Sequence, residues 1–474
     1  MKFSHVAIIT VLILMPVKAQ AQATPQSSKQ PAAWPSMVAF VDLPKVGQVN
    51  TRWTQTGQAA KVERLPKPDP AQSHEAEHGA IEHGVATMAL PEFEQIALHH
   101  NPTLALARAR IQAARGHWLQ EGLYPNPTIG YSGEEMGDEG TSGKQGGVIS
   151  QEFVTAGKLR LNRAVASREI AKLQQEAAAQ QFRVLTDVRT HFYEVLVDQS
   201  KIELIEQLVK IGEEGVRTAE ALIRAKEASR VDLLQARVEV DSTRILLVNA
   251  RRDHEAAWRM LAAVLGCPSM PMPRLSGNAE DFGPPLEWEG SLDRLLMESP
   301  ELAAARAEVS RTRCAIQRAC AQRTPNIGLE TSVHQDNVTD SQIAAVRLGI
   351  PLLIFDRNQG NIAAANSDLI AACRNVERIR LQLQTRLAET FDRYASTRNQ
   401  VEKYKSSIIP NARESLDLIG VGYQQGEFGY LMLLTAQRTY FRSNLAYIES
   451  LKELKLATAE IEGFLLKDSL AAGE

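Results

Sequence analysis

The residues with the most recognisable chemistry are His74-Glu75-Ala76-Glu77-His78, which match the HExxH pattern of zinc proteases. On a helix, this spacing places both imidazoles on one face with a glutamate beside them. Prolines lie just upstream, Gly79 follows, and no apolar periodicity offers a face on which such a helix could pack. We therefore expect no catalysis here. A solvated linker is the default interpretation, and loose metal binding by His74, His78 and His83 is the alternative.

A second set of charged residues falls within segments of alternating polarity. Glu152, Glu330 and Arg347 each lie on the polar side of such a segment. Inside a water-filled barrel, charges at these positions would influence what passes. Paired across neighbouring strands, they would be purely structural. The sequence leaves both interpretations open.

The elements that carry these charges come in two copies. Asn126 and Asn326 each follow a proline, and Leu233-Leu234 recurs as Leu433-Leu434. A period this long exceeds that of a solenoid unit and indicates one duplicated supersecondary unit. We predict a first repeat at 89–265, a Pro- and Gly-rich equatorial segment at 266–290, and a second repeat at 291–466. Each repeat is predicted to contain a helix, two strands, a very long helix and a return helix.

The predicted strands are apolar on one side and polar on the other. In the first repeat they cover residues 128–132 and 148–153, and in the second they begin at Ile327 and end at Ile350. Four strands cannot close on themselves, and their bare edges would be a liability. Amphipathic strands suit a transmembrane barrel with a wet interior, so several chains must contribute to it. Three chains would supply twelve strands, although the alternation itself does not specify three.

The predicted helices are too long for a compact domain. The segment from Lys158 to Ile223 lacks proline and would measure ~100 Å as one helix. A seven-residue seam typical of coiled coils runs along it, formed by Val188, Val195, Ile202, Val209, Val216 and Ile223. In the second repeat, a helix is predicted over 358–423 with a kink at Pro410, followed by a last helix from Tyr430 to Leu466. These helices are predicted to leave the membrane as a tube whose turns, near 224–230 and 424–430, mark its far end.

The two ends of the chain differ from the repeats in composition. Residues 1–23 have the charged start, apolar run and small-residue cleavage site of a signal peptide. Residues 24–88 are rich in proline and are predicted to be a disordered linker, and 467–474 form a short tail. The net charge of −3 gives no reason to expect nucleic-acid binding. We expect no cofactor and no enzymatic activity.

Several motifs resemble the TolC family of outer-membrane efflux proteins over about residues 90–466. The first repeat contains Ser150-Gln151-Glu152-Phe153-Val154-Thr155-Ala156-Gly157-Lys158-Leu159-Arg160. The second contains the run from Ile350 to Asn361, and Leu433-Leu434-Thr435-Ala436-Gln437-Arg438 opens the last helix. Phe355-Asp356-Arg357-Asn358-Gln359-Gly360-Asn361 is most similar to the heavy-metal branch, which is CzcC-like and CusC-like.

The resemblance implies a mostly α-helical trimer in the outer membrane, with a twelve-stranded β-barrel in lipid and a twelve-helix periplasmic tunnel. It also implies passive conduction of substrates, most notably heavy-metal cations, in partnership with a periplasmic adaptor and a proton-driven inner-membrane pump of the RND type. The adaptor is expected to dock at the helical tips. Carried over by position, the tip residues are Arg224, Lys226, Glu227, Asp232, Gln424, Gly426, Glu427 and Gly429.

Three alternatives remain at this point. Asp232 could form a cation-attracting ring where three chains meet, or it could be an ordinary acidic residue at a helix N-terminus. The cargo could be drugs or peptides rather than metals. The chain could also be a periplasmic coiled-coil scaffold without a pore, although a scaffold has no use for four amphipathic strands.

Overall fold

The computed structural model describes residues 87–471 except 138–139, 141, 226–228 and 426. The predicted signal peptide, the linker up to residue 86, and His74, His78 and His83 lie outside the described residues, so those predictions stay open. All structural statements below concern the unit that contains Ala80–Glu474.

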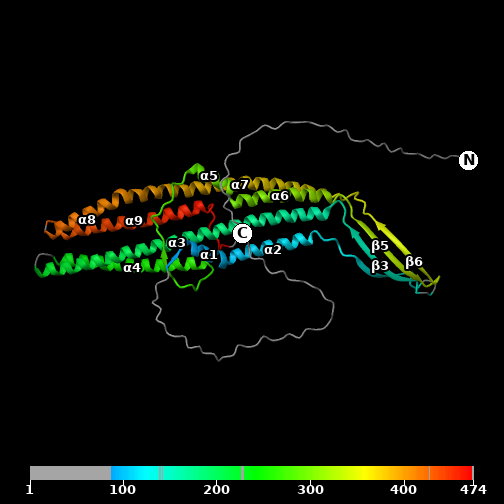
Figure 1. Ribbon diagram of the computed structural model, residues 1–474, viewed down its shortest axis with the longest axis horizontal. Helices are drawn as coiled ribbons and strands as arrows, with labels where there is room; N and C mark the ends of the chain where they lie inside the picture. The colour runs from blue at the N-terminus through cyan, green and yellow to red at the C-terminus, as the bar shows by residue number, and fades with distance from the viewer. Residues whose placement is uncertain (1–86, 138–139, 141, 226–228, 426, 472–474) are drawn as a thin grey trace, which may run out of the picture. The chain divides into compact units, whose positions relative to one another are not determined.

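Both repeats contain the predicted order of elements (Figure 1). The first comprises α1 (Leu90–His100), α2 (Pro102–Gln120), β2 (Thr128–Glu134), β3 (Lys144–Phe153), α3 (Lys158–Ala225) and α4 (Arg230–Val264). The second comprises α5 (Trp288–Glu298), α6 (Pro300–Ala321), β5 (Ile327–Asp336), β6 (Ser341–Gly349), α7 (Gln359–Lys403), the π-helix η2 (Tyr404–Ile408), α8 (Ile409–Gln424) and α9 (Tyr430–Glu462). The unbroken length of α3 confirms the long helix that its seven-residue seam predicts.

The opening helix of each repeat is divided in two at a proline. Asn101 ends α1, and its Oδ1 accepts a 2.9 Å hydrogen bond from the Thr103 backbone N, which caps α2. Its Nδ2 donates to the Val264 carbonyl at 2.7 Å, so this buried side chain also ties the break to the end of α4. Pro300 likewise begins α6 directly after Ser299, although the Ser299 side chain makes no capping hydrogen bond.

The helix that contains Pro410 changes its winding just before that residue. Proline lacks the N–H of a helical turn, and its ring clashes with the carbonyl four residues earlier. Here the five residues of η2 separate α7 from α8 as a π-turn, and the kink at Pro410 stays a prediction.

The last helix is shorter than predicted: α9 ends at Glu462 rather than at Leu466. A Cβ at Gly463 would collide with Thr186 Oγ1 of α3, so the chain passes α3 closely here. Phe464 and Leu465 then adopt φ angles of 58° and 59°, and both side chains are buried. Tertiary packing of this turn, which no local pattern reveals, ends the helix.

The large sheet has the order β2-β3-β5-β6, and all its pairings are antiparallel. In register, Ile129 lies opposite Ile149, which lies opposite Thr331, which lies opposite Val346. Apolar side chains therefore line up across the sheet on one face, as their alternation predicts. In Figure 1 this sheet lies beyond one end of the long helices, and the α3–α4 and α8–α9 hairpins form the other end.

A second, unpredicted sheet joins the start of the first repeat to the segment between the repeats. The strand β1 (Thr87–Ala89) pairs in parallel with β4 (Arg274–Ser276). Thr87 and Met88 therefore belong to a strand and not to the predicted linker. Leu275 of β4 is buried in a cluster that includes Phe93, and Met88 packs against the same cluster.

Two hydrophobic clusters occupy the middle of the helical region. One surrounds Phe93 and Leu261, and the other surrounds Leu383 and Leu454. Among the helices that the structure describes, none combines the length and apolar content needed to cross a bilayer.

Candidate functional site

The four-stranded sheet has its apolar face outward. Ile129 is 78% exposed, Tyr131 68% and Val346 71%. On the opposite face, Ser332 and His334 are both buried. This is the reverse of a sheet that packs on a water-soluble core, where apolar side chains are covered and polar ones face solvent. Strands of this polarity suit an environment that is apolar outside and wet inside.

The three charged strand residues predicted to face a lumen do lie on the polar face. Glu330 and Arg347 are opposite one another in register, and Arg347 Nη1 donates to Glu330 Oε1 at 3.0 Å. Glu152 is separate and accepts a 2.8 Å hydrogen bond from Asn326 Nδ2. Cross-strand pairing therefore exists for two of the three, and any role in passage stays a prediction.

Asn326 is a structural residue that the site prediction missed. Its Oδ1 accepts hydrogen bonds from Lys158 Nζ at 2.6 Å and from the Thr155 backbone N at 3.3 Å. It thereby joins the start of β5 to the start of α3. The repeated Pro-Asn pair was the available signal, because an asparagine at the same place in both copies suggests a shared junction.

An ion-pair ladder connects α3 and α4. Glu206 pairs with Arg251 at 2.7 Å, Glu213 with Arg244 at 2.7 Å, and Glu220 with Arg237 at 2.9 Å. Each step is seven residues along either helix, in opposite directions, as an antiparallel coiled coil requires. Exposed pairs contribute little stability individually, so this ladder mainly selects the register of the hairpin. Glutamates and arginines at seven-residue spacing were the signal in the sequence.

The ends of the two hairpins share a small core. Tyr430 and Leu434 of α9 pack with Ala236 of α4, and Val216 and Tyr423 lie against them. The Tyr423 and Tyr430 rings are 6.1 Å apart. The two hairpins are therefore packed together near their tips.

Two predicted tip residues have local roles at the start of α4 and of α9. Asp232 Oδ2 accepts from the Ser229 backbone N at 3.1 Å, and Ser229 Oγ accepts from the Val231 N at 3.2 Å. This reciprocal cap is the ordinary role of an acid in a first helical turn. Gly429 is the residue before α9.

Three other predicted tip residues lie at or near the ends of α3 and α8. Arg224 is exposed in the last turn of α3, and the Glu427 backbone N donates to the Gly422 carbonyl at 2.8 Å. Gln424 is the last residue of α8. Lys226, Glu227 and Gly426 lie outside the described residues. The tip assignments and the ring of Asp232 stay predictions.

An apolar stripe on α4 faces away from α3. It consists of exposed side chains three, four or seven residues apart, at Val231, Leu234, Val238, Ile245 and Val248. On α8, Leu418 and Val421 are exposed with the same spacing. Stripes of this kind are the seams of coiled coils, and no helix in the described part of this chain covers them.

The segment between the repeats is fastened to the second repeat near η2. Glu280 accepts hydrogen bonds from Lys405 Nζ at 2.7 Å and from Tyr447 Oη at 2.9 Å. The bond from Lys405 lowers the pKa of Glu280. The Leu286 backbone N also donates to Tyr394 Oη at 2.9 Å. This segment therefore ties α7, η2 and α9 together.

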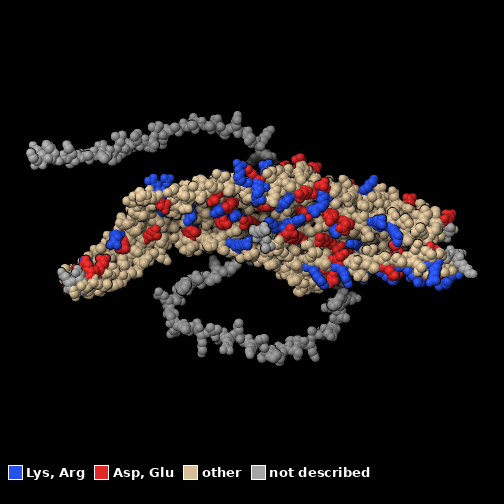
Figure 2. Space-filling model, turned by 180° about the vertical axis from the view of Figure 1, so that it is seen from behind, with Lys and Arg blue, Asp and Glu red and all other residues tan. Residues whose placement is uncertain are grey.

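Charges of both signs are intermixed on the helices. On the face in Figure 2, they are denser over the central helices than over the sheet. Midway along α3, burial raises the pKa of Asp198 to about 6, although Lys201 and Lys452 lie near enough to oppose the shift. In the parts of the chain that the structure describes, no group of three or more His, Cys, Asp or Glu side chains could hold a metal ion.

Comparisons with known proteins give a consistent picture. A family model described as "Outer membrane efflux protein" matches residues 94–267 and 291–465. The cobalt-zinc-cadmium resistance protein CzcC of Cupriavidus metallidurans is 26% identical over 370 residues, covering 78% of this chain and 88% of that protein. The toluene efflux pump outer membrane protein TtgC of Pseudomonas putida is 23% identical over 427 residues, covering 82% of this chain and 86% of that protein.

Solved structures show the same fold. A crystal structure of CusC superimposes with a TM-score of 0.67 at 16% sequence identity, covering 86% of this chain and 99% of that one. This likeness confirms the predicted fold class, which is mostly helical with a small β part.

Proposed function

Because the chain belongs to the outer membrane efflux protein family, we propose that it is the passive outer-membrane duct of a tripartite export system that carries heavy-metal cations. Family membership confirms the predicted outer-membrane efflux role and the absence of an enzymatic function. Similarity to relatives such as CzcC confirms the resemblance to the heavy-metal branch.

The exposed apolar face of the four-stranded sheet is the observation that supports the duct most directly. Its apolar face would cost free energy in water, at ~25 cal/mol for each Å² of apolar surface exposed, and lipid removes this cost. With Ile129 and Val346 toward lipid, the charged pair Glu330–Arg347 faces the interior. Three chains would contribute twelve strands and close both free edges, β2 and β6.

The exposed stripes on α4 and α8 support the same assembly. Each has coiled-coil spacing, so neighbouring chains in a trimer could cover it and continue the barrel as a helical tunnel. The tips then point away from the membrane. A periplasmic adaptor would dock there and connect the duct to a proton-driven inner-membrane pump.

The cargo proposal rests on relatives. CzcC is named for resistance to cobalt, zinc and cadmium, whereas TtgC, which matches over a similar share of the chain, is named for toluene efflux. Export of organic compounds is therefore the second candidate. A pore-free scaffold is disfavoured because it would leave the apolar side of the sheet in water.

The experiment is a complementation assay in a cobalt-sensitive bacterium that has an adaptor and pump of this class but lacks the outer-membrane component. We expect the full chain to fractionate with the outer membrane and to lower cell-associated cobalt, zinc or cadmium. Unchanged metal content together with restored toluene tolerance would select the second candidate. A chain absent from the outer membrane would contradict the duct itself.

A further inference from the structure

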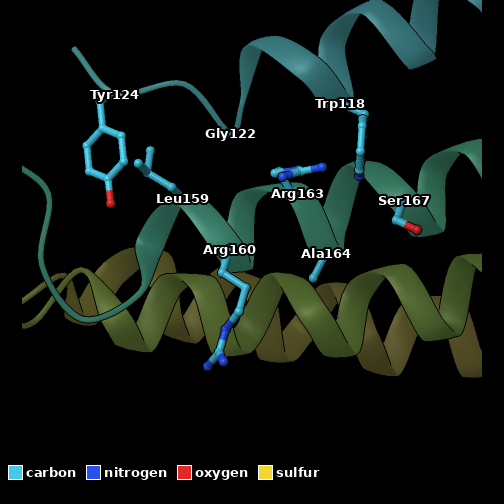
Figure 3. Close-up of a pocket in the computed structure, with 8 residues that line it drawn as sticks. All are labelled: Trp118, Gly122, Tyr124, Leu159, Arg160, Arg163, Ala164 and Ser167. Carbon is cyan, nitrogen blue, oxygen red and sulfur yellow. The ribbon is translucent and has the colours of Figure 1, made fainter.

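A hollow of about 410 Å³ lies where the helices meet the sheet, between the end of α2 and the first turns of α3. Figure 3 shows its lining, which consists of Trp118, Gly122, Tyr124, Leu159, Arg160, Arg163, Ala164 and Ser167. Tyr124 and Leu159 lie at one end, and Trp118 and Ser167 lie at the other. One wall is thus apolar, and hydroxyl groups are available at both ends.

Arg163 is the cation that faces this hollow. Its guanidinium carbon lies 3.7 Å from the centroid of the Trp118 ring. In Figure 3, Arg163 reaches toward Trp118, whereas Arg160 extends away from both. Gly122 makes room for this arrangement, because a Cβ there would lie 2.9 Å from Arg163 Cγ and closer still to Cδ. The stack holds the guanidinium in one orientation and leaves its N–H edges available.

Within the described residues, Arg163 has no carboxylate partner and donates no hydrogen bond. Arg189 further along the same helix differs, because its Nε donates to Glu94 at 2.7 Å. A half-buried guanidinium that is oriented but unpaired is prepared for an external anion. Phosphate fits best, since its oxygens can accept two parallel N–H bonds from one guanidinium.

The surroundings of the hollow are apolar and exposed. Leu119 and Leu123, which are next in sequence to the lining residues Trp118 and Tyr124, are exposed. Leu352 and Phe355, which follow β6 at the same end of the sheet, are also exposed. Tyrosine, tryptophan and arginine typically gather where a membrane meets water. A free phosphate ion has no use for an apolar wall, whereas a phospholipid has a phosphate and acyl chains that together match both parts.

We propose that the hollow between Trp118 and Arg163 binds the phosphate of a phospholipid headgroup at the periplasmic surface of the outer membrane. This inference rests on the proposed function, because it needs a bilayer around the sheet. Arg163 donates to the phosphate, Ser167 offers a hydroxyl group one helical turn away, and the acyl chains lie along Leu159 and Tyr124 toward the strands. A lipid seated there fixes the depth of the sheet in the membrane.

The test uses the purified full chain in detergent, titrated with dioctanoylphosphatidylglycerol, with bound lipids counted by native mass spectrometry. Arg163→Gln is expected to weaken lipid binding about fivefold, the typical effect of one cation beside lipid phosphates. Arg115→Gln is the matched control, since Arg115 is exposed on α2 and does not line the hollow. Gly122→Ala should also weaken binding, because it displaces Arg163 without removing its charge.

Three results would overturn the inference. One is equal lipid binding by wild type and Arg163→Gln. Another is displacement of the lipid by inorganic phosphate at the same concentration, which would identify a soluble anion as the ligand. The third is loss of the oligomer in Arg163→Gln without a change in lipids bound to each chain, which would assign Arg163 to a neighbouring copy.

Outer-membrane fractionation of the cells that express the protein separates this inference from the proposed function. A wild-type protein absent from that membrane contradicts the duct. Lipid binding that ignores Arg163, in a protein that is present there, contradicts only the lipid site.

Discussion

Arg438 of α9 donates through Nε to Glu239 of α4 at 3.0 Å, although the two residues are 199 positions apart. Nη2 of Arg438 donates a second hydrogen bond to the same carboxylate oxygen, Oε2 of Glu239. This is a direct polar link between the two helical hairpins, close to the small core around Tyr430. Movement of one hairpin tip relative to the other would have to break it.

Arg438→Gln is therefore expected to loosen the hairpin ends. Amide hydrogen exchange in α8 and the first half of α9 should become roughly two- to fivefold faster, because exposed ion pairs are individually weak. Arg442→Gln is the control, since Arg442 is exposed on the same helix. Equal exchange in the two variants would mean that the pair does not hold the hairpins together.

Exchanging both charges of one ion pair in the α3–α4 ladder should restore the thermal stability that a single charge reversal removes. Glu206→Arg places two arginines together opposite Arg251 and should lower the Tm by roughly 1–3 °C. Adding Arg251→Glu restores an ion pair of opposite polarity and should recover most of that loss. A double variant no more stable than the single one would argue against register selection by these pairs.

Replacement by alanine should have opposite effects on stability at two glycines. Gly463→Ala should destabilise the protein by about 1–3 kcal/mol, because its Cβ would overlap Thr186. Gly116→Ala, within α2 and with open space around it, should be neutral or stabilising by up to ~1 kcal/mol. Thermal unfolding of both variants is the measurement, and a tolerated Gly463→Ala would show that the turn after α9 can move away from α3.

Asp198 predicts a pH dependence of stability. Burial raises its folded pKa to about 6 from the ordinary aspartate value of 3.8, so the folded state holds its proton more tightly than the unfolded state. Its stabilising contribution is full below pH ~4 and is lost as pH rises through about 6. Asp198→Asn should therefore raise the free energy of unfolding at pH 8 by ~1 kcal/mol. This is less than the pKa shift alone would give, because water reaches the carboxylate and screens it.

The same comparison at pH 4 should show little difference between wild type and Asp198→Asn. Asp417→Asn, at an exposed position on α8, is expected to leave the profile unchanged at both pH values. An Asp198→Asn effect of equal size at pH 4 and pH 8 would show that titration of this carboxyl is not its cause.

The sequence predicts features that depend on neighbouring residues and misses those that depend on contacts with distant parts of the chain. Alternation placed Ile129 and Glu330 on opposite faces, because side-chain direction in a strand needs only its neighbours. The pairing of Thr87 with Arg274 was missed, because a three-residue strand has no measurable period and its partner is distant. The end of α9 at Gly463 was missed because it depends on contact with another helix.

The tip shows the same limit. Positions near Asp232 could be proposed from the resemblance, and the cap between Asp232 and Ser229 lies within one helical turn. The link from Arg438 to Glu239 is found only when the helices are placed side by side. Heptad-spaced glutamates and arginines did carry long-range information. They specify the antiparallel register through a repeated spacing on two helices.

Site-directed spin labelling of the full chain in liposomes tests the central claim, that the apolar face of the sheet contacts lipid. Labels would be placed by Ile129→Cys and Val346→Cys on one face and by Ser150→Cys and Ala345→Cys on the other. The four native cysteines, which are free, would be replaced by serine. We predict that oxygen relaxes the first pair most strongly and that a water-soluble nickel complex relaxes the second pair. Relaxation of all four labels by the nickel complex would contradict the account.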